Sequence, residues 1–204
     1  MILTKEFLQQ QSVEKSIFSY TESRIHQENA VLNSKKNDIY DVFISHSFLD
    51  KPLVLTLVNL FNQAGYSVYV DWIEDSTLDR THVTETTVEL IRERITQSKS
   101  LAYIATSNIS SSKWCPWELG VADGIHDGRA AILPILSQNQ SFNGQEYLNV
   151  YPYIDYEKKS SGGMDFWVSD QKNPQNYVVL NHPFFLGAYN FLIIHLETYC
   201  HRSL

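Results

Sequence analysis

Glu118 and Trp114 have the residue types and the spacing that an active site needs. Glu118 follows Trp114 by four residues, so the two side chains share one face of a helix. A carboxylate in that place can hold hydroxyl groups or face a developing positive charge, and a tryptophan can stack on a flat ring. Taken alone, Glu118 is more simply explained by the preference of acids for helix N-termini, and Trp114 fits a core position equally well.

Four further candidates lie where apolar runs of the sequence end. Ser45 and His46 follow one run, and Asp71 and Trp72 end the next. Hydroxyl and imidazole groups can bind phosphate or sugar oxygens, and the Trp72 indole can stack on a base. We interpret Asp71 as an organiser of its loop. A plain alternative stays open for Ser45, which can also satisfy the backbone of a turn.

Apolar runs alternate with amphipathic segments through the middle of the chain. Near-continuous apolar strands separated by such helices predict a parallel sheet covered on both faces. We therefore expect a flavodoxin-like, doubly wound sheet of five parallel strands. The expected strands are residues 39–44, 66–72, 100–106, 131–136 and 150–155, and the expected helices between them are residues 50–65, 82–97 and 115–125.

Several residues predict where these helices begin and end. Asp50 is expected to cap the first helix, Pro52 fits its first turn, and Gly65 suits the left-handed residue that ends it. Gly120 and Gly124 lie within the third helix, where we interpret them as sites of close approach to a strand.

The fold class itself predicts the position of a ligand site. In a doubly wound sheet of order 2-1-3-4-5, ligands bind beyond the carboxyl ends of the strands, beside the first and third strands. The expected first strand is followed directly by Ser45, while the second ends at Trp72 and the third at Thr106. Glu118, in the first turn of the next helix, is expected to point towards the same crevice.

Composition excludes several classes of function. The net charge of -7 and the pI near 5.4 argue against a nucleic-acid partner, because phosphate binding depends on clustered Lys and Arg. Cys115 and Cys200 form no disulfide framework, and the histidines lack metal-ligand spacing, so we expect no metal. The sequence also lacks a signal peptide and any run of roughly 18 apolar residues. We expect a soluble, cytoplasmic protein with no membrane partner.

Three segments together resemble the signature boxes of Toll/interleukin-1 receptor (TIR) domains, over about residues 39–155. They are Tyr-Asp-Val-Phe-Ile-Ser-His-Ser at 40–47, the strand end Asp71-Trp72, and Ser-Ser-Lys-Trp-Cys-Pro-Trp-Glu-Leu at 111–119. The W-C-x-x-E-L pattern in the third box is similar to that of bacterial and plant TIR domains that hydrolyse or cyclise NAD. In those enzymes the glutamate is essential, so the resemblance implies that Glu118 is the catalytic residue. It also implies that NAD is the substrate and that no cofactor is needed.

The resemblance implies an NAD glycohydrolase or cyclase that breaks the nicotinamide–ribose bond. Its products would be nicotinamide and ADP-ribose, a cyclic ADP-ribose isomer or an ADP-ribose conjugate. The chain is similar to the TIR component of antiphage systems of Thoeris type, in which the product signals to a separate effector protein. Self-association through TIR surfaces is also expected.

Two other functions stay open. One is a non-catalytic TIR assembly module in which Glu118 only caps its helix, since fold alone does not establish chemistry. The other is an enzyme similar to nucleoside deoxyribosyltransferases, which share the fold logic and a catalytic glutamate.

Two parts of the chain lie outside the resemblance. We expect residues 1–38 to form an N-terminal helical segment with a linker, and residues 39–204 to form the TIR domain with a C-terminal extension. Within that extension, residues 160–176 are expected to be loop and residues 183–199 a closing helix. We expect removal of residues 1–37 to alter assembly more than folding.

Overall fold

The computed structural model of the chain describes residues 3–18, 39–75, 84–137, 146–173, 175 and 177–180. The expected linker at 33–38 and the expected closing helix at 183–199 lie outside these described residues. None of the described helices is long and apolar enough to cross a membrane.

One sheet of eight strands forms the centre of the molecule, in the order β3-β2-β4-β5-β6-β7-β8, with β1 paired to β5. From β3 to β6 every neighbouring pair is parallel, which confirms the expected doubly wound core of order 2-1-3-4-5. The strands are β1 Leu3–Thr4, β2 Tyr40–Ser45, β3 Val68–Tyr69, β4 Ser98–Ala105, β5 Ala130–Leu136, β6 Tyr153–Lys158, β7 Met164–Ser169 and β8 Tyr177–Val179.

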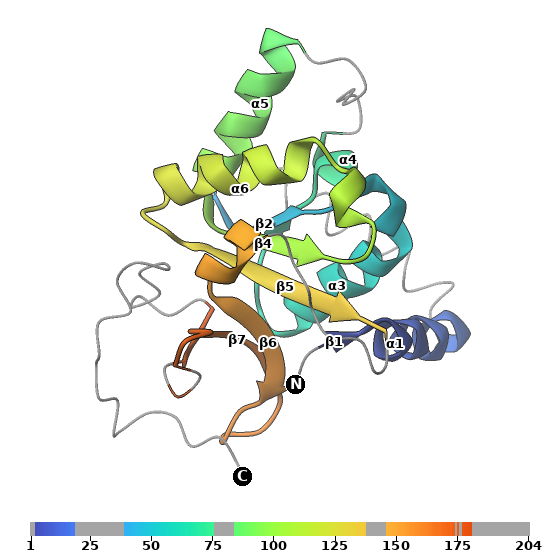
Figure 1. The fold of residues 1–204 in the computed structure, drawn as a ribbon. Helices are drawn as coiled ribbons and strands as arrows, with labels where there is room; N and C mark the ends of the chain where they lie inside the picture. The colour runs from blue at the N-terminus through green and yellow to red at the C-terminus, as the bar shows by residue number, and fades with distance from the viewer. Residues whose placement is uncertain are drawn as a thin grey trace.

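Helices cover both faces of this sheet (Figure 1). Helices α1 and α3 pack on one face, and α5 and α6 pack on the other. The short α4 starts two residues after β3, so the second strand is shorter than expected. The helices are α1 Lys5–Phe18, α3 Lys51–Gln63, α4 Asp71–Glu74, α5 Glu85–Thr96 and α6 Trp114–Ile125, with 3-10 turns η1 Phe48–Asp50, η2 Ile109–Ser111 and η3 Glu146–Val150.

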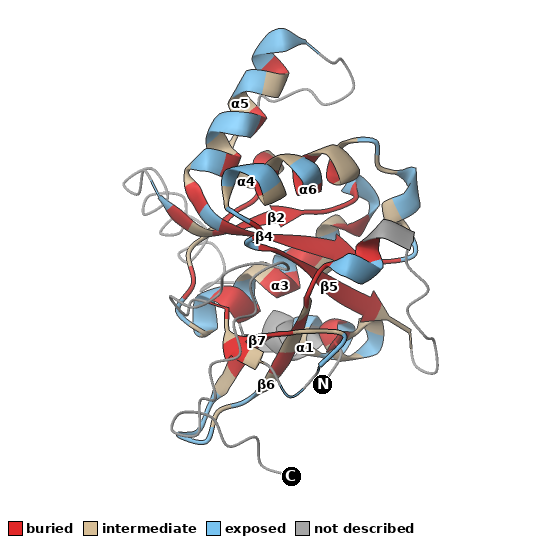
Figure 2. Cartoon of the chain, turned by 60° about the vertical axis from the view of Figure 1, so that its left-hand side comes forward, coloured by how far each residue is buried: buried red, intermediate tan, exposed pale blue. Residues whose placement is uncertain are grey.

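The alternation of side chains along the strands sorts the core into two layers. In β2, Val42 and Ile44 pack into the cluster that contains α3, whereas Phe43 packs into the cluster that contains α5 and α6. Ser45 has the same parity as Phe43 and therefore faces α6. Buried residues are concentrated in β2, β4 and β5, while α5 is mostly exposed (Figure 2).

The expectation of a loop at residues 160–176 is wrong. Residues 164–169 form β7, which pairs antiparallel with β6 after a turn in which Gly162 and Gly163 have φ of 91° and 78°. Phe166 of β7 is fully buried and stacks on Phe61 of α3, with ring centroids 3.7 Å apart. In the sequence, the two adjacent glycines indicate a loop. In the structure, residues distant in the sequence bury Phe166, and the segment forms a strand.

The N-terminal segment belongs to the same core as the sheet. Its expected helix is confirmed over residues 5–18, and β1 adds a short parallel pairing in which Leu3 lies opposite Ile135. Leu3 and Leu8 are both buried in the cluster that contains α3. Burial of these two side chains contributes to the stability of the core.

The predictions of where helices begin and end were only partly right. Pro52 lies in the first turn of α3, and Gly65 follows its end with φ of 92°, as expected. Asp50 occupies the N-cap position but makes no side-chain capping bond there. The interpretation of Gly120 and Gly124 was wrong, because a Cβ at either position would meet nothing within 4 Å.

Candidate active site

A buried hydrogen bond between Ser45 and Glu118 lies at the centre of the candidate site. The Ser45 hydroxyl donates to Oε2 of Glu118 at 2.6 Å. Ser45 is 1% exposed and Glu118 is 0% exposed. Strand alternation turns Ser45 towards α6, and helical spacing places Glu118 on the inner face of α6 with Cys115, Leu119 and Ala122.

The burial of Glu118 has two consequences. A buried carboxylate is costly unless it is hydrogen-bonded, and the Ser45 hydroxyl supplies one such bond to Glu118. Because Glu118 has no exposed surface, a substrate reaches it only after neighbouring side chains move. The structure therefore shows the site in a closed arrangement.

His46 and Trp72 are joined by a second contact at the same edge of the sheet. The Trp72 indole Nε1–H donates to Nε2 of His46 at 2.9 Å, and Nδ1 of His46 lies 3.2 Å from the carbonyl oxygen of Ile44. Because Nε2 accepts this bond, the ring proton is on Nδ1 and is donated to Ile44. His46 is thus a neutral ring that orients Trp72, which argues against a role as a general base.

Asp71 completes this group. Its side chain is buried, and its Oδ1 lies 4.0 Å from Nε2 of His46. The structure thus brings His46, Asp71 and Trp72 together, as the carboxyl-edge rule predicted for the ends of the first two strands.

Trp114 lies among packing residues. Its ring and that of Trp117 meet edge to face with centroids 5.6 Å apart, and both pack against the cluster beneath α5 and α6. Trp114 is half-buried, so part of its ring remains exposed. Its expected role in substrate binding stays a prediction.

Sequence reasoning missed a buried polar network around Asp50. The Asp50 carboxylate accepts bonds from the Thr106 hydroxyl at 2.6 Å and from the Asn108 amide at 2.7 Å. These bonds tie the turn after β2 to the turn after β4, which explains why Asp50 does not cap α3. Polar residues at the ends of the first and third strands were the signal that could have revealed the network.

The segment after β3 is held by a charged contact on the side of α5. Arg94 donates to both carboxylate oxygens of Asp75, at 2.8 and 3.0 Å, and the Tyr69 hydroxyl donates to Asp75 at 2.8 Å. Burial opposes ionisation of Asp75, but the bonds from Arg94 and Tyr69 outweigh it and lower the pKa of that carboxyl. Tyr40 lies beside this group, and burial together with Glu74 raises its pKa to about 12.

The charges at the carboxyl edge are mainly negative. Asp50, Asp71 and Glu118 are all buried there, in the turns and helices that follow β2, β3 and β4. Such an edge suits a ligand whose reacting end is cationic. Among the described residues there is no group of three His, Cys, Asp or Glu side chains suited to hold a metal ion.

Comparison with known proteins places these residues in a family context. The sequence model of the TIR domain matches residues 42–166, more than half of the chain. A probable 3' cyclic ADP-D-ribose synthase, ThsB', from Bacillus cereus (strain MSX-D12) is 48% identical over 148 residues, which cover 70% of this chain and 76% of the relative.

Two further matches were found. A putative cyclic ADP-D-ribose synthase, TIR2, from Cytobacillus dafuensis is 39% identical over 94 residues, which cover 46% of this chain and 24% of that protein. Among solved structures, the TIR domain of the Toll-related receptor TRR-2 from Hydra magnipapillata matches 54% of this chain and 78% of its own, with 22% identity and a TM-score of 0.40.

Proposed function

Because this chain belongs to the TIR domain family, we propose that it is an NAD-processing enzyme that breaks the nicotinamide–ribose bond and forms a cyclic ADP-ribose. The names of the two relatives, a "probable" and a "putative" cyclic ADP-D-ribose synthase, favour ring closure over release of linear ADP-ribose. The observation that carries the proposal is the buried Ser45–Glu118 pair at the carboxyl ends of the parallel strands.

Glu118 is the catalytic residue of the proposed reaction. When the bond between the ribose carbon and the nicotinamide nitrogen breaks, its electron pair leaves with nicotinamide, which departs as a neutral ring. Positive charge then develops on the ribose carbon, and the carboxylate of Glu118 stabilises it. A ribose hydroxyl takes over the bond that Ser45 donates in the closed site, so the carboxylate keeps a donor throughout.

Ring closure needs a nucleophile from the same molecule. A hydroxyl of the ADP half attacks the ribose carbon, and its proton passes to the Glu118 carboxylate. Water in that place would give linear ADP-ribose instead. A site that keeps water away from the ribose carbon while the dinucleotide is bound would favour the cyclic product.

The remaining site residues have supporting roles in this proposal. Trp72, oriented by His46, and Trp114 stack on the bases of the dinucleotide, and Asp71 lies close to the cationic ring before it leaves. The product signals to a separate effector protein in antiphage defence, and the enzyme acts in the cytoplasm as a self-associating protein.

The decisive test replaces Glu118 by glutamine, which retains an oxygen that accepts the Ser45 bond. We expect the rate of NAD turnover, measured by mass spectrometry, to fall at least about 10²–10³-fold, because charge stabilisation in the transition state is lost. The thermal midpoint should stay close to that of the wild type. Glu89→Gln, at an exposed position on α5, is the matched control.

Each alternative function makes a different prediction for the same experiment. A non-catalytic assembly module would leave NAD intact with the wild type and with Glu118→Gln alike. A deoxyribosyltransferase-like enzyme would consume nucleosides and leave NAD unchanged. Formation of nicotinamide and a product of the mass of cyclic ADP-ribose, dependent on Glu118, would exclude both.

A further inference from the structure

A lysine held between two aromatic rings lies at the rim of the candidate site. The Lys51 ammonium is 3.9 Å from the ring centroid of Phe48 and 4.9 Å from the ring centroid of Trp72. Both distances are within the range of cation–π attraction, so the rings restrict where the ammonium can lie. Within the described ranges, Lys51 makes no ion pair.

Phe48 exposes an unusual amount of apolar surface at this rim. It is 73% exposed, the largest value among the large hydrophobic residues described, and Leu49 next to it is 66% exposed. The ammonium of Lys51 lies over the Phe48 ring and leaves most of its surface free. A ring held in this way is a ready surface for stacking a base, since every nucleobase offers a flat face.

The buried acids explain why a cation is needed here. Asp50, Asp71 and Glu118 suit the cationic nicotinamide end of NAD, but they repel its diphosphate. A dinucleotide that places its reacting ribose at Glu118 therefore needs a positive group further out. Lys51 follows Asp50 directly, is half-buried, and has its ammonium over the Trp72 ring, so it is the cation that we assign to this role.

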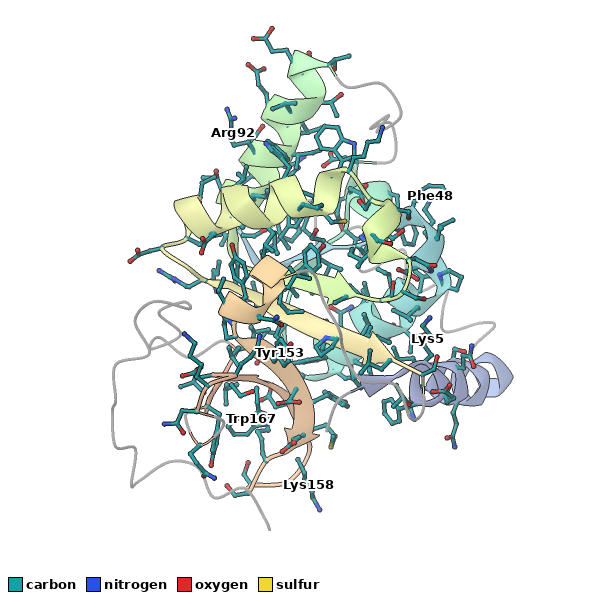
Figure 3. The ribbon with its side chains drawn as sticks, in the orientation of Figure 1. Lys5, Phe48, Arg92, Tyr153, Lys158 and Trp167 are labelled. Carbon is teal, nitrogen blue, oxygen red and sulfur yellow. The ribbon has the colours of Figure 1, made fainter. Side chains whose placement is uncertain are left out.

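The rim lies within reach of a dinucleotide whose ribose is at Glu118. Ser45 contacts Glu118, and Phe48 is only three residues further along the chain, a span of at most about 10 Å. Phe48 lies beside the helices that follow β2 and β3 (Figure 3). A ligand with two bases and a diphosphate between them can therefore reach from Glu118 to Phe48.

We propose that Lys51 and Phe48 bind the ADP half of the dinucleotide, Lys51 through the diphosphate and Phe48 by stacking on adenine. This inference rests on the proposed function and deepens it, because it assigns a specificity site to two residues outside the TIR signature boxes as quoted above. Phe48 and Lys51 would also hold the ADP half folded towards the ribose carbon, as ring closure requires.

Affinity measured by titration calorimetry tests the proposal on the full chain. The two probes are a carbocyclic NAD analogue that is not cleaved, and nicotinamide riboside, which lacks the diphosphate and the adenine. Lys51→Ala should weaken binding of the NAD analogue about 10- to 100-fold and leave binding of nicotinamide riboside unchanged. Lys51→Arg should retain most of the affinity. Phe48→Ala should weaken binding of the NAD analogue about tenfold, and Phe48→Tyr should bind it with the affinity of the wild type.

Matched controls separate this site from general surface effects. Lys158→Ala removes an exposed lysine that lies far from Phe48 in Figure 3, and Leu49→Ala removes the neighbouring exposed side chain. Both should bind the analogue as the wild type does.

Several outcomes would overturn the proposal. Unchanged affinity of Lys51→Ala and Phe48→Ala for the analogue would exclude the site, while cleavage of NAD by the wild type would leave the proposed function intact. Equal losses for the analogue and for nicotinamide riboside would show a purely structural role. If Phe48→Ala changed only the sedimentation of the protein, the ring would be covered by a second copy of the chain. A wild type that neither binds nor cleaves NAD would overturn both proposals.

Discussion

The hydrogen bond between Ser45 and Glu118 joins two side chains that are almost completely removed from solvent. A buried acceptor that loses its donor retains the full cost of its desolvation, whereas an exposed one recovers a bond from water. Stability, and the catalysis that we propose at Glu118, therefore depend on the same contact.

Ser45→Ala tests this dependence. We expect the free energy of unfolding, measured in urea, to fall by about 1–3 kcal/mol because Glu118 loses a buried donor. Ser161→Ala, at an exposed turn position, should change it by less than about 0.5 kcal/mol. Unaltered stability in Ser45→Ala would mean that other groups satisfy the carboxylate without the hydroxyl.

A second residue-scale prediction concerns His126 at the end of α6. Burial lowers the pKa of its imidazole below the ordinary value of about 6.5, even though Nε2 donates to the Ile95 carbonyl at 2.8 Å. Arg129 acts in the same direction. The unfolded chain therefore binds more protons than the folded chain as the pH falls below about 6.5.

The sign of the pH effect follows from that difference. The contribution of His126 is fully present above about pH 6.5 and is lost as the pH falls through the folded pKa. We expect the free energy of unfolding to decrease as the pH is lowered from about 7, and His126→Gln, which keeps a donor to Ile95, to reduce this slope. Identical slopes in the two proteins would contradict the prediction.

At the scale of elements, the N-terminal segment is part of the sheet and of the edge that carries the site. β1 pairs with β5, and Lys5 at the start of α1 donates to Ser107, which follows β4. Leu3 is fully buried beneath this pairing. Removal of residues 1–37 would therefore also remove part of the core, and its effect on assembly relative to folding stays a prediction.

Leu3→Ala measures the contribution of this element. Because Leu3 is fully buried in a packed cluster, we expect unfolding free energy to fall by about 2–5 kcal/mol. Leu55→Ala, on the outer side of α3 with 37% exposure, should lower the free energy of unfolding much less. Denaturant unfolding of both variants gives the comparison, and equal costs would show that β1 is dispensable for the core.

At the scale of the whole molecule, the fold of a single chain buries Glu118, the residue that we propose as catalytic. Glu118 is 0% exposed, so the proposed turnover requires an open form in which substrate can reach this side chain. Contacts between copies that favour the open form would shift this balance, as any ligand that binds one state does. The proposed self-association supplies such contacts.

The concentration dependence of the rate tests this link. We expect NAD turnover per mole of chain to rise with protein concentration, in parallel with the average mass measured by sedimentation. Added serum albumin at equal total protein is the control for crowding. Turnover per mole that stays constant while the chain remains monomeric would show that opening occurs within one copy.

Sequence patterns predicted the framework of the protein and the neighbourhood of its site. Apolar strands alternating with amphipathic helices indicated a flavodoxin-like, doubly wound parallel sheet, and the carboxyl-edge rule brought Ser45, His46, Asp71 and Trp72 to one edge. These predictions succeeded because periodicity of two and of 3.6 residues is a local property, and because parallel strands must end at a common edge.

Tertiary structure decided what depends on contacts between distant residues. Asp50 follows the local rule for a helix cap, yet its carboxylate binds Thr106 and Asn108, which lie more than fifty residues away. Phe166 follows two glycines that indicate a loop, yet burial against Phe61 makes its segment a strand. The sequence by itself determined the elements and the edge they share, whereas only packing across the chain determined which polar groups meet there, because hydrogen bonding and burial are properties of the assembled core.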